Sequence, residues 1–159
     1  RDLPPSGPIV RCDRRLIGQA LTNLLQNAAD AIIMTGRGKP GENGPEGLVQ
    51  PIGHIVVGLH IRDGHVLLGI EDDGIGLPAG ERHRLTEPYV THKAKGTGLG
   101  LAIVKKIMED HAGMLHLTDR DPDPSNGRRG TLVTLSLPLA EPDSAGEKED
   151  RIMRVTDGT

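Results

Sequence analysis

Apolar residues recur in pairs at helical spacing between residues 13 and 34, which predicts an amphipathic helix. Asp13 stands just before this pattern, where a residue that caps the helix N-terminus is expected. A second helical pattern covers residues 99–112, and Gly113 follows it at the position that favours glycine after a helix. The pattern therefore predicts two long helices.

Strand-like segments lie between and around these helices. Residues 54–61 and 65–72 alternate in polarity around a short turn and predict a β-hairpin. Residues 114–119 and 130–138 predict a second strand pair, and residues 9–12 predict a short fifth strand. Together the elements predict an α/β fold, a two-layer α/β sandwich in which a mixed sheet packs against helices.

The remaining internal segments are predicted to be irregular. Glycine and proline at short intervals in residues 35–53 predict a loop, and residues 87–98 show no periodicity. A short helical piece is expected near residues 79–85. The longest structured stretches are therefore the two helices and the strand pairs.

Composition limits the class of protein. The chain has 159 residues, enough for one domain with a core. We expect residues 1–8 to be a linker from an upstream segment, residues 9–139 to be the domain and residues 140–159 to be a polar, disordered tail. The net charge of −3 gives no basic surface for nucleic acid, and no apolar run approaches the roughly 20 residues that span a bilayer. The single cysteine, Cys12, excludes an internal disulfide and suits a reducing compartment.

Three polar residues of the first predicted helix form a candidate metal site. Asn23, Asn27 and Asp30 occupy positions i, i+4 and i+7 and therefore share one face. An amide oxygen could complete the octahedral shell of Mg²⁺, which keeps waters and takes other ligands from phosphates. An ordinary solvated polar face would show the same spacing.

Asp72 is the second candidate, because it ends an apolar strand and is followed by Asp-Gly-Ile-Gly. A carboxylate at a strand end beside two glycines can point into a pocket. Since an ionised carboxylate only accepts hydrogen bonds, it would select a base that carries an amino group. The alternative interpretation of these residues is an ordinary Asp-Gly turn.

Three glycines, Gly96, Gly98 and Gly100, lead directly into the second predicted helix. Glycine lets the backbone approach a ligand closely, and a helix N-terminus favours a phosphate. The stretch is not a P-loop, because the chain contains no G-x-x-x-x-G-K-[ST] string. It does not fit a dinucleotide fingerprint either, since the required third glycine is missing and a polar loop precedes it. A tight turn without a ligand is the remaining alternative.

Taken together, these motifs resemble the catalytic, ATP-binding domain of sensor histidine kinases, over nearly the whole chain up to Leu139. The family's N box matches NLLQNAADAI (23–32), and its G1 box matches DDGIGLP (72–78). Its F and G2 boxes both lie in EPYVTHKAKGTGLGLAIVKKI (87–107), and its closing Gly-Thr strand matches GTLVTLSLP (130–138). The resemblance implies the Bergerat ATP-binding fold of the GHKL superfamily. Within the sensor kinases, the sequence of residues 85–113 is most similar to NtrY-type nitrogen-regulation sensors.

The resemblance also implies ATP and Mg²⁺ as cofactors and a role for each matching residue. Asn27 would ligate Mg²⁺, with Asn23 and Asp30 beside it on the same face. Asp72 would accept the adenine amino group. The other residues implied to contact the nucleotide are Gly74, Gly76, Lys93, Lys95, Gly96, Thr97, Gly98, Leu99, Gly100, Leu101 and Thr131.

A flexible ATP lid is implied over residues 87–97. Lys93 and Lys95 lie in this loop, where they could neutralise phosphate charge. Tyr89 stands where the family's F box usually carries phenylalanine, and we expect its ring to be buried in the packing of the lid.

The partners implied are those of a two-component sensor. None of the seven histidines lies in the context of a phospho-accepting histidine. The resemblance therefore implies a separate histidine-bearing dimerisation domain of the same kinase and a downstream response regulator. It also implies a homodimeric, membrane-anchored sensor whose catalytic domain is cytoplasmic, with no acid, base or nucleophile in this fragment.

Two other functions stay open. A self-contained ATPase of the same superfamily, similar to the gyrase and Hsp90 group, would activate water with a glutamate four residues before the metal-binding asparagine. Asn23 occupies that position, and an amide cannot act as a general base. The other is a nucleotide-binding module without kinase activity.

Overall fold

The computed structural model describes residues 7–36, 53–78, 80, 84–89, 98–122, 127 and 129–140. Its elements, in chain order, are α1 (Arg14–Ile33), β1 (Ile55–Arg62), β2 (His65–Asp72), α2 (Gly100–Asp110), β3 (Met114–Asp119) and β4 (Thr131–Pro138). Each matches a predicted element to within two residues at either end. Most of the predicted linker, loops and short helix, and the tail after residue 140, lie outside the described residues.

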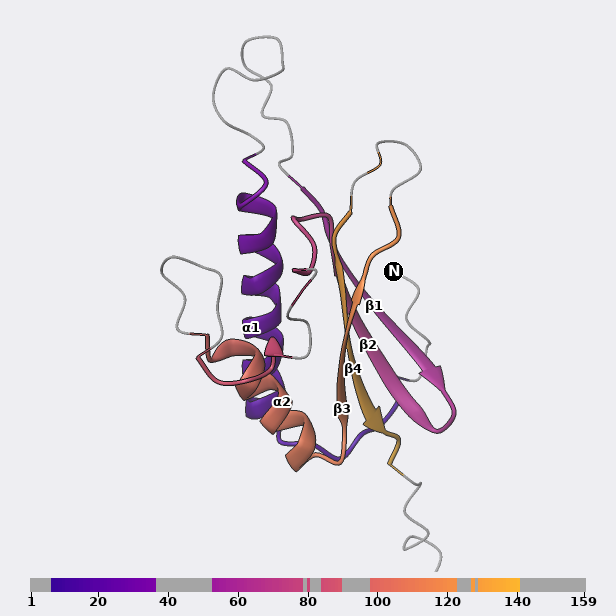
Figure 1. The fold of residues 1–159 in the computed structure, drawn as a ribbon. Helices are drawn as coiled ribbons and strands as arrows, with labels where there is room; N and C mark the ends of the chain where they lie inside the picture. Colours follow the sequence, from indigo (N-terminus) through magenta and orange to yellow (C-terminus); the bar gives the residue numbers. More distant parts are fainter. Residues whose placement is uncertain are drawn as a thin grey trace, which may run out of the picture.

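The four strands form one sheet in the order β1-β2-β4-β3. Both helices cover the same face of this sheet (Figure 1), which gives the predicted two-layer α/β sandwich. Every pairing among the described strands is antiparallel, so the parallel pair that a mixed sheet requires is not found in this part of the chain. The sheet therefore presents one covered face, on which α1 contacts β1 and β2 and α2 contacts β3 and β4.

The predicted strand at residues 9–12 is wrong, because this segment has no strand conformation in the structure. It makes one backbone hydrogen bond to the end of the sheet, from the N–H of Ala140 to the carbonyl of Ile9 at 2.8 Å. The segment is confined between Pro8, which has no N–H to donate, and Asp13, which already caps α1. Val10 packs against the core instead.

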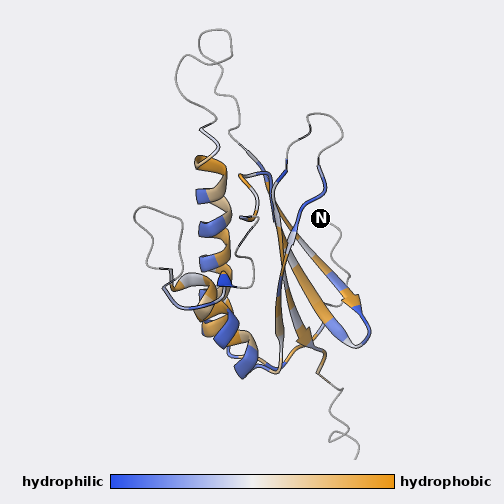
Figure 2. Ribbon diagram, in the orientation of Figure 1, coloured by the Kyte–Doolittle hydropathy of each residue, from blue (hydrophilic) through white to orange (hydrophobic). Residues whose placement is uncertain are grey.

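The core follows from the periodicities of the sequence. In α1 the buried residues are spaced by four, so that one stripe faces the sheet. Hydrophobic residues dominate β2 and β4, while hydrophilic residues interrupt both helices (Figure 2). The buried cluster comprises Ala20, Leu24, Ala28, Ile70, Val104, Ile107, Met108, Val133, Leu135 and Leu137. None of the described helices is long and apolar enough to cross a membrane.

The end of α2 differs from the prediction in one residue. Ala112, with a φ of 52°, adopts the left-handed conformation that was expected of Gly113. The N–H groups of Ala112 and Gly113 donate to the carbonyls of Glu109 (3.1 Å) and Met108 (2.8 Å), which is a Schellman motif. Gly113 is required for another reason, since a Cβ there would lie 2.5 Å from the carbonyl oxygen of Ser136.

Candidate functional site

A cavity of about 340 Å³ opens between the two helices and the covered face of the sheet. It is lined by α1, the end of β2, the start of β4, the turn after β2 and the start of α2, together with Leu117 of β3 and Leu85 of the segment before α2. Its walls include nine of the predicted site residues: Asn23, Asn27, Asp30, Asp72, Gly76, Gly98, Gly100, Leu101 and Thr131. The fold therefore brings residues of all four sequence motifs to one cavity.

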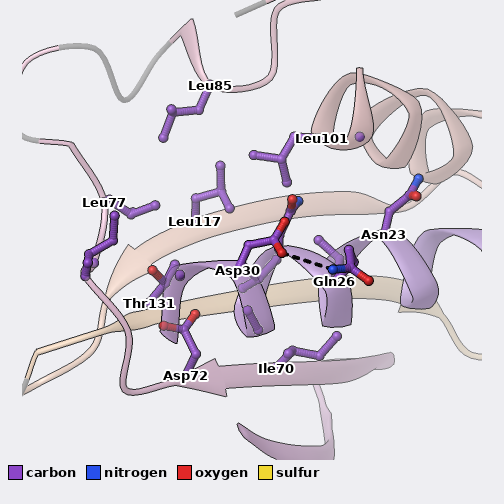
Figure 3. Close-up of a pocket in the computed structure, with 18 of the residues that line it drawn as sticks. Asn23, Gln26, Asp30, Ile70, Asp72, Leu77, Leu85, Leu101, Leu117 and Thr131 are labelled. Carbon is purple, nitrogen blue, oxygen red and sulfur yellow. Dashed lines mark hydrogen bonds between the residues drawn. The ribbon is translucent and has the colours of Figure 1, made fainter. Parts of the chain in front are cut away.

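Asp72 and Thr131 lie at the sheet end of the cavity (Figure 3). They face each other across β2 and β4 in the strand register, and both are buried. Asp72 Oδ1 accepts a hydrogen bond from the N–H of Gly74 at 2.8 Å. Burial raises the pKa of the Asp72 carboxyl, although backbone hydrogen bonds from Gly74 and Thr131 offset part of that rise. This end of the cavity thus presents a buried hydrogen-bond acceptor beside a hydroxyl group.

The turn after β2 is held against α1. A Cβ on Gly74 would lie 2.6 Å from the backbone carbon of Ala31, so only glycine allows this approach. The N–H of Ile75 donates to the carbonyl of Ala31 at 3.1 Å. Gly76 follows with a φ of 77°, in the region that favours glycine. Gly74 does not line the cavity, so its place in the turn is structural, whereas Gly76 does line it.

The helix end of the cavity is polar. Asn23 lies at the opposite end of the view from Asp72 (Figure 3), and its Nδ2 is buried without a hydrogen-bond partner. Asp30 lies between them and accepts a hydrogen bond from Gln26 Nε2 at 3.0 Å. A buried amide N–H without an acceptor is costly, so a ligand that brings an acceptor to Asn23 would be favoured.

The start of α2 completes this end. Gly98 has a φ of 68°, and Leu99 is the N-cap residue, whose side chain makes no capping hydrogen bond. Leu99 therefore supplies no side-chain acceptor to the first N–H groups of α2, which suits an anion there. Leu101 lines the cavity, whereas Leu99 does not. The predicted residues Lys93, Lys95, Gly96 and Thr97 lie outside the described residues.

The expectation for Tyr89 is wrong. Its residue is 78% exposed, with a φ of 66°, so the ring is not buried in lid packing. The Tyr89 N–H donates to the carbonyl of Gly98 at 3.1 Å, which places the start of the predicted lid beside the residue that follows it. The size and hydrophobicity of a tyrosine ring are therefore not enough to predict that it is buried.

Sequence reasoning missed the apolar wall of the cavity and one polar residue, Gln26. The apolar residues that line the cavity and were not predicted as site residues are Leu24, Ala28, Ala31, Met34, Ile70, Ile75, Leu77, Pro78, Leu85, Leu117 and Val133. Gln26 could have been found, since it lies one turn before Asp30 on the same helix. The flat faces of a purine ring would suit such a wall.

The family model of histidine kinase-, DNA gyrase B- and HSP90-like ATPases (HATPase_c) matches residues 12–141. The chain belongs to this family. The match covers all the described elements of the HATPase_c domain, so the predicted ATP-binding architecture is confirmed.

Relatives and solved structures connect this HATPase_c domain to sensor kinases. It is 44% identical over 151 residues to the nitrogen regulation protein NtrY of Azorhizobium caulinodans, which covers 92% of the chain and 18% of that relative. The mycobacterial sensor histidine kinase MprB superposes with a TM-score of 0.62 at 34% identity, over 84% of this chain and 76% of the other. The catalytic domain of the histidine kinase ThkA gives a TM-score of 0.59 at 30% identity, over 81% and 70%. The resemblance to sensor histidine kinase catalytic domains is therefore confirmed, although the chain spans less than a fifth of NtrY.

Asp72→Asn is expected to stabilise the nucleotide-free domain at neutral pH. A carboxyl whose folded-state pKa is raised contributes stability below its unfolded pKa, and loses that contribution as the pH rises through the folded value. The ionised group therefore costs stability at pH 7, and asparagine removes that cost. Thermal unfolding should show a higher Tm for Asp72→Asn at pH 7 and a smaller difference near pH 4. The exposed Asp121→Asn is the control, and a lower Tm for Asp72→Asn at pH 7 would contradict the argument.

Proposed function

We propose that this domain binds Mg·ATP in the cavity and presents the γ-phosphoryl group to a histidine on a separate dimerisation segment of the same kinase. The observation that carries the proposal is the polarity of one continuous cavity. A buried acceptor, Asp72, lies at one end, and an unpartnered amide N–H, that of Asn23, lies at the other. ATP offers an amino group at one end and phosphate oxygens at the other.

At the sheet end we assign Asp72 to the adenine amino group. Thr131 lies opposite it in the register, and Gly76 lines the same end. A base there would contact apolar side chains of the cavity wall such as Ile75 and Leu77. An apolar slot with one fixed acceptor orients a purine as well as holding it.

At the helix end the donor set fits magnesium held jointly with phosphates. Within the described part of the chain, no three His, Cys, Asp or Glu side chains gather into a metal site. A neutral amide such as that of Asn27 suits an ion that keeps waters and takes phosphate oxygens. A Cβ built on Gly100 would lie 3.8 Å from Asn27 Nδ2, so the start of α2 lies close to this amide. Bound Mg²⁺ would neutralise charge on the phosphates, and we propose Asn27 as its protein ligand.

Asn23 and the start of α2 would hold the phosphates from the protein side. The Asn23 amide would donate to a phosphate oxygen, and the uncapped N–H groups after Leu99 would face the same charge. Asp30, fixed by Gln26, would orient waters or the neighbouring amides. A role in nucleotide binding is proposed, from the sequence motif alone, for Lys93, Lys95, Gly96 and Thr97. Closure of a lid over residues 87–97 is proposed on the same basis.

Phosphoryl transfer is favoured over hydrolysis because the described walls of the cavity hold no carboxylate in position to act as a general base. Their only carboxylates are Asp30 and Asp72, and Asp72 is committed to the base end. Asn23 stands where an ATPase of this superfamily would need its glutamate base, and an amide cannot take a proton from water. Transfer to a histidine asks mainly for positioning and charge stabilisation, which this site supplies.

The proposed partners follow from this activity. They are the histidine-bearing dimerisation domain and a response regulator downstream, in a homodimeric sensor anchored in the membrane whose catalytic domain is cytoplasmic. No contact with nucleic acid or lipid is proposed for the domain itself, and the net charge of the chain is −3. Residues 9–139 are proposed as the domain boundaries.

Incubation with γ-labelled ATP is expected to leave no label on the domain and to release little free phosphate. Adding the separately produced dimerisation segment should transfer label to its histidine. A dimerisation segment with that histidine replaced by alanine is the control and should stay unlabelled. Rapid phosphate release by the domain alone would instead support the self-contained ATPase, and binding without transfer would support a nucleotide-binding module.

A further inference from the structure

His111, half-buried just beyond the last turn of α2, uses both nitrogens of its ring. Its Nδ1 lies 2.6 Å from the carbonyl oxygen of Ile107 in α2. The backbone N–H of Asp13 donates to its Nε2 at 2.9 Å, across 98 residues of sequence. The ring therefore joins the end of α2 to the residue that caps the start of α1.

These two contacts determine the tautomer of the ring. A carbonyl oxygen only accepts, so Nδ1 must carry the hydrogen, and Nε2 must be bare to accept from a backbone N–H. A neutral imidazole with its proton on Nδ1 is the one form that satisfies both. Asn or Gln could reproduce one of the contacts, but neither side chain has the rigid reach to make both.

The two helices that His111 joins are also the two that line the polar end of the cavity. At that end, a Cβ on Gly100 would lie 3.8 Å from Asn27 Nδ2. Asp13 and His111 meet at one end of the helix pair, and Asn27 and Gly100 meet at the other, so the helices run antiparallel along each other (Figure 1). A shift of α2 along α1 at the His111 end would thus also move Gly100 relative to Asn27.

Between these two ends the contact is apolar. Ala20 and Leu24 of α1 belong to the same buried cluster as Val104 and Met108 of α2. Apolar burial is non-directional, so it holds the helices together without fixing their register along the axis. Hydrogen bonds have a narrow range of distance and angle, and the His111 ring supplies them at the end of α2.

We propose that His111 is a positioning residue, which sets the register of α2 on α1 and so the spacing between Gly100 and Asn27 at the phosphate end of the cavity. This role rests on the proposed function, because it matters only if phosphates bind there. His111 touches no cavity wall, so it acts through the helices. The base end, built by β2 and β4, should be insensitive to it.

The test compares Mg·ATP with adenosine in wild type and His111→Phe. Phenylalanine keeps the ring and removes both hydrogen bonds. Mg·ATP affinity, measured by calorimetry, should fall roughly two- to tenfold, which corresponds to the loss of about one ordinary hydrogen bond. Adenosine affinity, measured by chemical-shift titration, should stay within about twofold, because the base end is unchanged. Long-range ¹H–¹⁵N spectra of the wild type should show the Nδ1–H tautomer.

Two further variants separate positioning from stability. His111→Asn can still donate to Ile107 but does not reach Asp13, so it should stay better folded and still lose the preference for Mg·ATP over adenosine. Leu115→Ala removes a half-buried side chain of β3 that packs on the core away from the cavity. It should lower the Tm and leave that preference intact.

The outcomes are distinct. Unchanged ratios of Mg·ATP to adenosine affinity in His111→Phe or His111→Asn, with normal binding by the wild type, would overturn the positioning role alone, as would an Nε2–H tautomer. Equal changes for both ligands, matching those of Leu115→Ala, would also overturn it. Failure of the wild type to bind Mg·ATP would overturn the proposed function, and the positioning role with it.

Discussion

Wild-type domain is expected to bind ATP about ten- to a hundredfold more tightly than GTP, and Asp72→Asn is expected to remove most of that preference. Asp72 is 4% exposed and fixed by the Gly74 N–H, so its acceptor cannot turn away from the base. Adenine presents an amino donor at the purine 6-position, whereas guanine presents a carbonyl and would leave two acceptors facing each other. A hydrogen bond to a charged group contributes roughly 1.5–3 kcal/mol, which gives the factor expected.

Calorimetric titration with both nucleotides measures this directly. In Asp72→Asn the amide can donate to a guanine carbonyl, so affinity for ATP should fall while affinity for GTP stays the same or rises. Asp121→Asn, at an exposed position after β3, is the matched control and should bind like the wild type. Equal affinities of the wild type for ATP and GTP would show that Asp72 does not read the base. Together with the expected rise in Tm, this variant would show that the domain keeps a destabilising buried charge for recognition.

The regular elements could be predicted because their burial has a clear period. The α1 stripe and the alternation in β2 each have one buried face, so periodicity located them to within two residues. The failures occurred where a local signal had no periodic support. Residues 9–12 have strand-forming residue types but no strand conformation, and Tyr89 has an aromatic side chain on a left-handed backbone. Neither fact can be read from residue type.

The site was predictable where its chemistry is unusual for its position. Asn23 and Asp72 are polar residues within apolar elements, and three glycines lead directly into a helical pattern, so each required an explanation. Met34, Ile75 and Leu85 gave no such signal, since an apolar side chain looks the same in a cavity wall and in a core. The apolar slot was therefore found only once the turn after β2 was placed over α1.

Among the described glycines near the site, Gly130 is the one whose substitution by alanine is expected to destabilise the domain most. Gly130 immediately precedes β4, and a Cβ built on it overlaps the carbonyl oxygen of Asp72 and lies 2.7 Å from the Asp72 carbonyl carbon. These are backbone atoms at the end of β2, so no side chain can rotate to make room. The methyl group must push the start of β4 away from β2, at the point where Thr131 faces Asp72.

The same sheet offers a matched control. Gly69 lies within β2, and a Cβ there would meet Leu132 Cδ1 at 3.5 Å, an ordinary van der Waals contact. Gly69→Ala should therefore be neutral or stabilise the domain by about 0.5–1 kcal/mol, because alanine loses less backbone entropy on folding. Gly130→Ala should cost about 3 kcal/mol or more, at or beyond the upper end of typical overpacking.

Denaturant unfolding of the two variants measures these free energies. Nucleotide titration at a low denaturant concentration measures the effect on binding, since moving Thr131 away from Asp72 disrupts the base end of the cavity. Gly130→Ala should thus lose affinity for adenosine as well as for Mg·ATP, unlike His111→Phe, which should lose only the affinity that depends on the phosphates. Equal stabilities for Gly130→Ala and Gly69→Ala would mean that β4 can shift at no cost. The close pairing of the strand ends at Asp72 and Thr131 would then not determine the shape of the base end of the cavity.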